Sequence, residues 1–81
     1  MSKLGKYEWR TIWSIDLARW GSDIQIRYDG RNWRVRFVWR NLIDKSDKSF
    51  GEPEHLWLST FSAEIQGAML AAYPDIATPS I

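Results

Sequence analysis

Three arginines recur at alternate positions in the middle of the chain, where their side chains suit anion binding. Arg34, Arg36 and Arg40 share one parity of the segment NWRVRFVWR (32–40), and the other parity is apolar. Alternate residues of a β-strand point to opposite faces, so this segment predicts a strand with an arginine face and an apolar face. Arginine presents a planar fork of donors that suits bidentate contacts with phosphate. The pattern therefore predicts binding of an anionic partner.

The two preceding strands that the sequence predicts extend this arginine face. By parity, the face holds one arginine from residues 7–17, one from residues 23–28 and three from residues 32–40: Arg10, Arg27, Arg34, Arg36 and Arg40. Glu8 and Asp16 share the parity of Arg10 in residues 7–17, and two carboxylates cannot neutralise five guanidiniums. A solvated charged face, with weak pairs across the strands, is the alternative.

An antiparallel meander is the arrangement that places these strands side by side. Residues 18–23 are predicted to be a turn around Gly21, because glycine supplies backbone freedom. Asp29 and Gly30 form the residue pair favoured in two-residue type I′ hairpin turns. The strands over residues 23–28 and 32–40 are therefore expected to pair as a hairpin.

The second half of the chain predicts a loop, a short strand and one helix. Residues 41–55 are polar and include Gly51 and Pro53, which predicts a long loop, and residues 55–59 suit a short fourth strand. Apolar side chains then recur at helical spacing over residues 62–73, with Ser62 as the expected N-cap. Pro74 ends this helix, and residues 74–81 are predicted to be a tail.

The sequence therefore predicts one α+β domain over residues 1–81. A three- to four-stranded antiparallel meander, over residues 7–59, carries the C-terminal helix on one face. The expected core packs Trp33, Phe37 and Trp39 against helix residues at one stripe, namely Ile65, Ala68, Met69 and Ala72. By the same parity, Trp9 and Trp13 are expected on the core side of the sheet.

Trp57 and the outer side of the helix are two further candidates for binding. Trp57 lies between Leu56 and Leu58, so it faces outward beside the arginines if both leucines face the core. There it is available to stack on a base or a guanidinium. Small residues and one leucine follow the helix's outer side, which suits self-association or a partner helix: Ala63, Gly67, Leu70 and Ala71. The alternative is that the 41–55 loop or the tail covers this side.

Composition argues against catalysis, a metal site or a cofactor. The 81 residues include no cysteine and one histidine, His55, and no spacing matches a catalytic triad, a calcium loop or a nucleotide-binding loop. No apolar run is long enough for a membrane span, and the N-terminus lacks the apolar run of a signal peptide. We therefore predict a soluble cytoplasmic protein that is not an enzyme.

Charge is distributed unevenly along the chain, although the formal net charge is only +1. Residues 1–40 contain nine Lys and Arg against four Asp and Glu, and residues 41–81 contain two against six. Such asymmetry is typical of a surface that binds a polyanion. The acidic half folding back onto the basic half is the alternative.

The segment WLSTF (57–61), followed by a helix with Ala68, Ala71, Ala72 and Tyr73, resembles the AP2-like fold. That fold includes the plant AP2 domain and the arm-type DNA-binding domains of phage integrases. The resemblance covers roughly residues 24–73. It implies a three-stranded sheet that reads DNA through Arg and Trp side chains. On this chain, the residues so implicated are Arg27, Arg34, Arg36 and Trp57.

Two functions follow as expectations from the sequence. The first is a small module that binds nucleic acid on its arginine face, with DNA favoured over RNA. The second is a phage-type inhibitor or adaptor whose arginine and tryptophan side chains bind an acidic surface of a host or CRISPR/defence protein. Binding of a small phosphorylated ligand is a third, weaker expectation. A homodimer is compatible with each of them.

Overall fold

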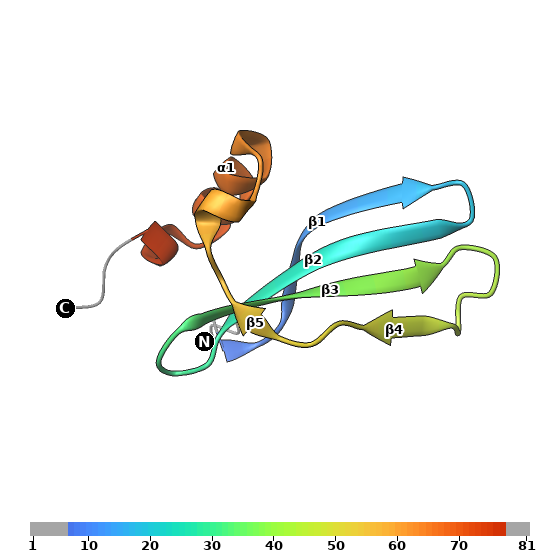
Figure 1. The fold of residues 1–81 in the computed structure, drawn as a ribbon, viewed down its shortest axis with the longest axis horizontal. Coiled ribbons are helices and arrows are strands. Elements are labelled where there is room, and N and C mark those ends of the chain that lie inside the picture. Colours follow the sequence, from blue (N-terminus) through green and yellow to red (C-terminus); the bar gives the residue numbers. More distant parts are fainter. Residues whose placement is uncertain (1–6, 78–81) are drawn as a thin grey trace, which may run out of the picture.

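The computed structural model describes residues 7–77, which form an antiparallel sheet with one α-helix on one face (Figure 1). This is the α+β architecture that the sequence predicts. The elements follow in chain order: β1 (Arg10–Leu17), β2 (Trp20–Tyr28), β3 (Trp33–Asn41), β4 (Lys48–Phe50), β5 (Glu54–His55), the 3-10 turn η2 (Leu58–Thr60), α1 (Ala63–Ala72) and the 3-10 turn η3 (Pro74–Ala77).

The sheet is a meander in the order β1-β2-β3-β4, and β5 also pairs with β3. β4 lies against the end of β3, with Val38 opposite Phe50, and β5 lies against its beginning, with Arg34 opposite His55. The prediction of one long loop over residues 41–55 is therefore wrong in part, because two short strands from this segment cover the edge of β3. The predicted strand over residues 55–59 is wrong beyond His55, because Leu58–Thr60 forms a 3-10 turn.

The two hairpin turns differ from their predictions. β2 begins at Trp20, so the predicted turn over residues 18–23 shortens to Ala18 and Arg19. A type I′ turn needs a positive φ at both of its central residues. Among residues 7–77, Gly30 alone has a positive φ, of 99°, so the next turn is not of type I′. Instead, the Asp29 carboxylate accepts the backbone N–H groups of Arg31 at 2.9 Å and of Asn32 at 2.8 Å. An Asp side chain that bonds the backbone ahead of it stabilises a turn in this way.

α1 begins and ends where the sequence indicates. Ser62 is the N-cap, and its hydroxyl accepts the Ile65 N–H. The helix ends before Pro74, which disfavours helical geometry at Tyr73. Residues 74–77, predicted as tail, form η3 instead, and Ile76 packs against the core. The rest of the predicted tail, residues 78–81, lies outside the described residues.

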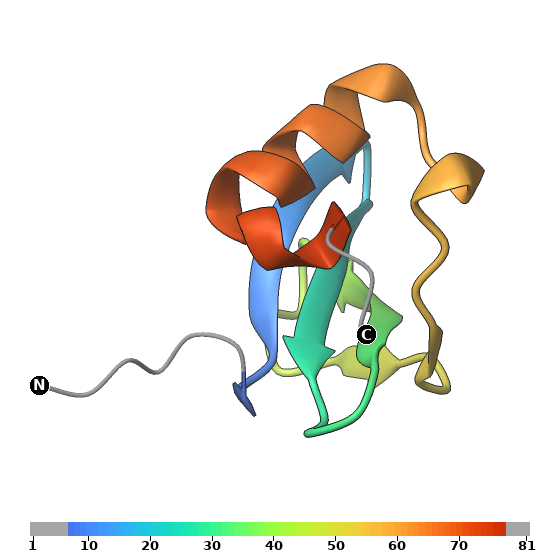
Figure 2. The ribbon, with the colours of Figure 1, turned by 90° about the vertical axis from the view of Figure 1, so that its left-hand side faces the viewer.

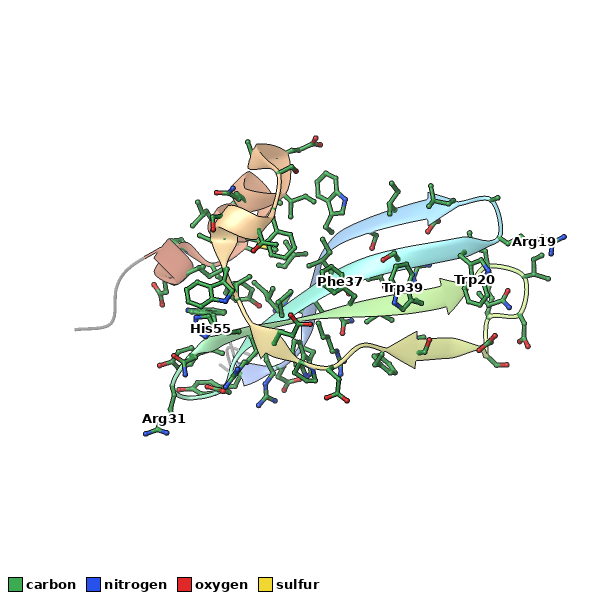
Figure 3. The ribbon with its side chains drawn as sticks, viewed as in Figure 1. Arg19, Trp20, Arg31, Phe37, Trp39 and His55 are labelled. Atoms are coloured by element: carbon green, nitrogen blue, oxygen red, sulfur yellow. The ribbon has the colours of Figure 1, made fainter. Side chains whose placement is uncertain are left out.

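The core lies between α1 and one half of the sheet (Figure 2). Its buried residues come from β2, β3, the β5–η2 segment and α1: Ile24, Ile26, Val35, Leu56 and Met69. Trp33, Phe37 and Ile65 pack against this cluster, as predicted. Two parts of the core prediction are wrong, because Ala72 is exposed and Trp39 is 49% exposed. The strands continue beyond the helix (Figure 1), and Trp39 lies on the part that α1 does not cover (Figure 3).

A β-bulge changes the faces of the first strand. Thr11 lies opposite Gln25 and Trp13 opposite Ile24, so Ile12 is an extra residue in β1. The parity of β1 therefore changes at Ile12. Arg10 lies opposite Ile26 and points to the helix side, so its predicted place on the arginine face is wrong. Trp9 moves to the opposite face, which overturns its predicted place on the core side.

Candidate binding site on the arginine face

Four arginines occupy the face of the sheet opposite α1, which we call the arginine face. In the β2–β3 ladder, Arg36 lies opposite Gln25, Arg27 opposite Arg34, and Arg40 opposite Gly21. Side chains that face each other across a ladder lie on one face, and the next row lies about 6.7 Å along the strand. The structure thus brings together four of the five arginines that the sequence predicts here. The side chains that each of these four arginines contacts are different.

Arg40 is bound within the protein. Its Nε and Nη2 atoms donate to the two carboxylate oxygens of Asp23 at 3.0 and 2.8 Å, and Nη2 also donates to Asp16 at 2.9 Å. These hydrogen bonds raise the pKa of Arg40. Gly21 leaves room for this pair, since a Cβ there would lie 2.6 Å from Nη2. Arg40 therefore holds three strands together and has little capacity for an outside anion.

Arg34 also has a carboxylate partner, because its Nε atom donates to Asp29 at 3.0 Å. The backbone N–H groups of Asn32 and Arg31, and then the Arg34 guanidinium, hold the pKa of Asp29 well below its ordinary range. Sequence reasoning missed Asp23 and Asp29 as partners because both lie where the predicted strand over residues 23–28 meets its turns. Within residues 7–77, three aspartates on this face therefore form ion pairs with two of its four arginines.

Arg36 lies between two aromatic rings. Its guanidinium carbon is 4.4 Å from the ring centroid of Trp9 and 4.4 Å from that of Phe50. Its Nε atom donates to Gln25 at 2.8 Å, and Gln25 in turn donates to Thr11 at 3.1 Å. Burial, and then the charge of Arg27, lower the pKa of Arg36. The guanidinium is thus fixed in position before any ligand arrives.

Arg27 shares the Trp9 ring, with its guanidinium carbon 5.6 Å from the centroid. Among residues 7–77, neither Arg27 nor Arg36 forms an ion pair. We call Trp9, Arg27, Arg36 and Phe50 the arginine–tryptophan cluster. Two guanidiniums that repel each other on one aromatic platform are stabilised by an anion that contacts both. The cluster depends on the bulge at Ile12, which the parity of the sequence does not reveal.

Trp57 extends the aromatic surface near the arginine face. Leu56 is buried and Leu58 packs on the core, so Trp57 faces outward as predicted and is 63% exposed. Its ring lies 4.3 Å from that of His55, which is opposite Arg34 in the β3–β5 ladder. Figure 3 shows His55 and Arg31 at the same end of the sheet, with Arg19 at the far end. An exposed indole therefore accompanies the arginines at this end.

Other predicted features are placed but not given a role by the structure. The outer side of α1 is open at Ala63, Gly67 and Ala71, and Leu70 is half-buried. Within residues 7–77, no three His, Asp or Glu side chains gather closely enough to hold a metal ion. No helix of the described chain is both long and apolar enough to cross a membrane.

Comparisons with known proteins add no assignment. No family model matches the chain, and searches of curated proteins and of solved structures find no significant match. The resemblance to AP2-like domains, with the DNA-binding role that it implies for Arg27, Arg34, Arg36 and Trp57, therefore stays a prediction.

Proposed function

We propose that this protein is a non-enzymatic module that binds single-stranded nucleic acid on its arginine face. The observation that carries the proposal is the arginine–tryptophan cluster, in which Arg27 and Arg36 lie against Trp9 without a carboxylate partner among the described residues. A guanidinium stacked on an aromatic ring keeps its N–H edge available for a phosphate. In this proposal the cluster binds the sugar–phosphate backbone.

Nucleic acid suits this face better than a small anion because the face offers aromatic surface as well as charge. Trp57 is exposed beside His55, and His55 lies opposite Arg34, two residues along β3 from Arg36. One strand that follows β3 would place a phosphate at the cluster and a base on Trp57. Base–aromatic stacking beside cationic side chains is how proteins bind single strands with little sequence preference.

The ion pairs on this face limit the strength of binding. Arg34 and Arg40 are held by aspartates, so Arg27 and Arg36 carry most of the contact with phosphate in this proposal. Few phosphate contacts mean modest affinity at low salt and weak binding at physiological salt. Such a partner is compatible with the cytoplasmic location that the sequence predicts.

The experiment is a titration of labelled single-stranded DNA and RNA of mixed sequence, followed by fluorescence anisotropy at low salt. The wild type is expected to bind, and Arg27→Gln with Arg36→Gln is expected to lose most of the affinity. Arg10→Gln is the control, because it removes one arginine charge from the opposite side of the sheet and should bind like the wild type. If the wild type binds neither DNA nor RNA, the proposal is wrong, and an acidic protein surface becomes the expected partner.

A further inference from the structure

The half of the sheet that α1 leaves uncovered carries large apolar side chains on the helix side. In the ladders, Leu17, Trp20 and Asn41 form one row, and Ile15, Ser22 and Trp39 form the next. Four of these side chains are between 45% and 60% exposed: Ile15, Leu17, Trp20 and Trp39. We call these four residues the apolar overhang. Figure 3 shows Trp20 and Trp39 along the part of the sheet beyond the helix.

A groove of about 360 Å³ lies between the apolar overhang and α1. Ser22 and Ile24 of β2 lie between larger neighbours on β1 and β3, and Ile65 of α1 closes one end: the lining residues are Trp13, Ile15, Ser22, Ile24, Phe37, Trp39 and Ile65. A cavity of ~150 Å³ suffices for a benzene ring, so this groove has room for a large aromatic side chain. Trp20 lies one row beyond the groove on the same face and is such a side chain.

The two ends of this surface carry opposite charges. Arg19 lies in the turn at the far end of the sheet (Figure 3), and Glu64 lies in the first turn of α1, next to the groove residue Ile65. Both side chains are exposed, and neither forms an ion pair within residues 7–77. Trp20 projects from one end of this surface, and the groove lies nearer the other end. When a second copy faces it in the opposite direction, each Trp20 meets the other copy's groove and each base meets an acid.

We propose that a second copy of this chain covers the apolar overhang, in a two-fold dimer. The axis lies between the two faces and runs across the strands, so each sheet end lies beside the helix of the other copy. Helices and sheets both pack about 10 Å from a sheet, so the α1 of one copy shares a layer with the sheet of its partner. Trp20 of each copy then enters the groove of the other, and Arg19 faces the partner's Glu64.

The area of the surface agrees with a dimer of moderate affinity. Taking ~200 Å² for each large side chain, four half-exposed residues offer roughly 400 Å² of apolar surface per copy. A patch of this size is at the level where exposed apolar surface marks an interaction site. Two such patches with their polar rims approach the lower limit of specific interfaces, ~1,200 Å² in total.

The test is the molar mass of the full chain by sedimentation equilibrium, from low micromolar to near-millimolar concentration. The wild type is expected to rise from the 9.5 kDa of one chain to twice that mass. Leu17→Glu places a charge in the interface at an exposed position, so it should stay at one chain mass while remaining folded by circular dichroism. A wild type that is monomeric at every concentration overturns the proposal.

Two further variants locate the interface. Arg19→Glu should weaken the dimer, and Arg19→Glu with Glu64→Arg should restore it, because the charges are exchanged across the contact. Gly67→Glu is the matched control, since it adds the same charge as Leu17→Glu but on the outer side of α1. It should leave the dimer intact. Dissociation by Gly67→Glu, with Leu17→Glu still dimeric, would place the interface on the small residues of α1 and overturn the proposal. Nucleic-acid binding uses the opposite face, so it stands or falls separately.

Discussion

The guanidinium of Arg36 lies 4.4 Å from the ring centroid of Trp9, although β2 separates β3 from β1, the strand that Trp9 precedes. The bulge at Ile12 makes this contact, because it moves Trp9 from the helix side to the arginine face. Cation–π contacts order an arginine without neutralising it. The contact with Trp9 thus holds the Arg36 charge in place without neutralising it, whereas Arg34 and Arg40 form ion pairs with aspartates.

Replacing Trp9 should therefore affect both stability and binding. Trp9→Leu keeps an apolar side chain but removes the aromatic face under Arg36 and Arg27, at an expected cost of ~0.5–1 kcal/mol in the free energy of unfolding. Urea denaturation of Trp9→Leu, Arg36→Gln and the double variant measures the coupling. Additive effects of the two changes would show that the contact contributes nothing.

The Arg40 ion pairs predict an unusual response at Gly21. Replacing a glycine inside a strand by alanine normally stabilises the folded protein. Here the new Cβ would lie 2.6 Å from Arg40 Nη2 and 2.7 Å from Asp16 Oδ1. Both atoms end flexible side chains that can shift, but a shift of Arg40 weakens its bonds to the buried Asp23, so Gly21→Ala should lower the melting temperature by roughly 2–8 °C. Gly67→Ala is the control, because nothing lies within 4 Å of its Cβ and the change should raise the melting temperature. An unchanged or higher melting temperature for Gly21→Ala would contradict this account of Arg40.

Hydrophobic periodicity was sufficient to predict the three long strands, the helix and the side of the sheet that Phe37 and Trp33 occupy, but not the short strands β4 and β5. It could not predict the bulge at Ile12, because an inserted residue changes the parity of β1 without a marker in the sequence. The predicted faces of Arg10 and Trp9 were wrong for that reason. Asp23 ends the predicted turn and begins the predicted strand, so its position opposite β3 was not fixed and its pairing with Arg40 was missed.

The length of the helix relative to the sheet was a second limit. Trp39 has the parity of Phe37, and parity alone places both in the core. Ten residues of α1 at ~1.5 Å each cover about 15 Å, whereas β2 and β3, with nine residues each, span about 30 Å. Residues at the far end of the strands are therefore left uncovered, which comparison of the element lengths could have indicated.

Core substitutions should reflect this difference between the two halves of the sheet. Met69 is fully buried, so Met69→Ala should cost ~2–5 kcal/mol in the free energy of unfolding. Trp39 is 49% exposed, so Trp39→Ala should cost about half of the ~3–5 kcal/mol typical of a buried tryptophan. Both are measured by urea denaturation at low protein concentration, where self-association does not contribute. A larger loss for Trp39→Ala than for Met69→Ala would place the core elsewhere.

Acid should weaken the β2–β3 hairpin through Asp29. The backbone N–H groups of Asn32 and Arg31, with Arg34, lower the pKa of Asp29 in the folded protein below its ordinary value of 3.8. The unfolded chain therefore binds this proton first, and the stability from Asp29 falls as the pH drops from the ordinary aspartate value towards the lower folded pKa. Asp29→Asn should reduce the loss of stability over that range, measured by thermal melting as a function of pH. An identical acid dependence in the variant would mean that Asp29 has an ordinary pKa when folded.

The salt dependence of single-stranded DNA binding tests the role of the arginine–tryptophan cluster most directly. Each phosphate neutralised contributes ~0.7 to the slope of log affinity against log salt for single strands. Arg27→Gln with Arg36→Gln should therefore reduce the slope by about 1.4 relative to the wild type. Arg27→Lys with Arg36→Lys should keep the slope but bind more weakly, because lysine keeps the charge without the planar fork. An unchanged slope in the double Gln variant, or the same reduction in Arg10→Gln, would contradict the proposal that Arg27 and Arg36 bind phosphate.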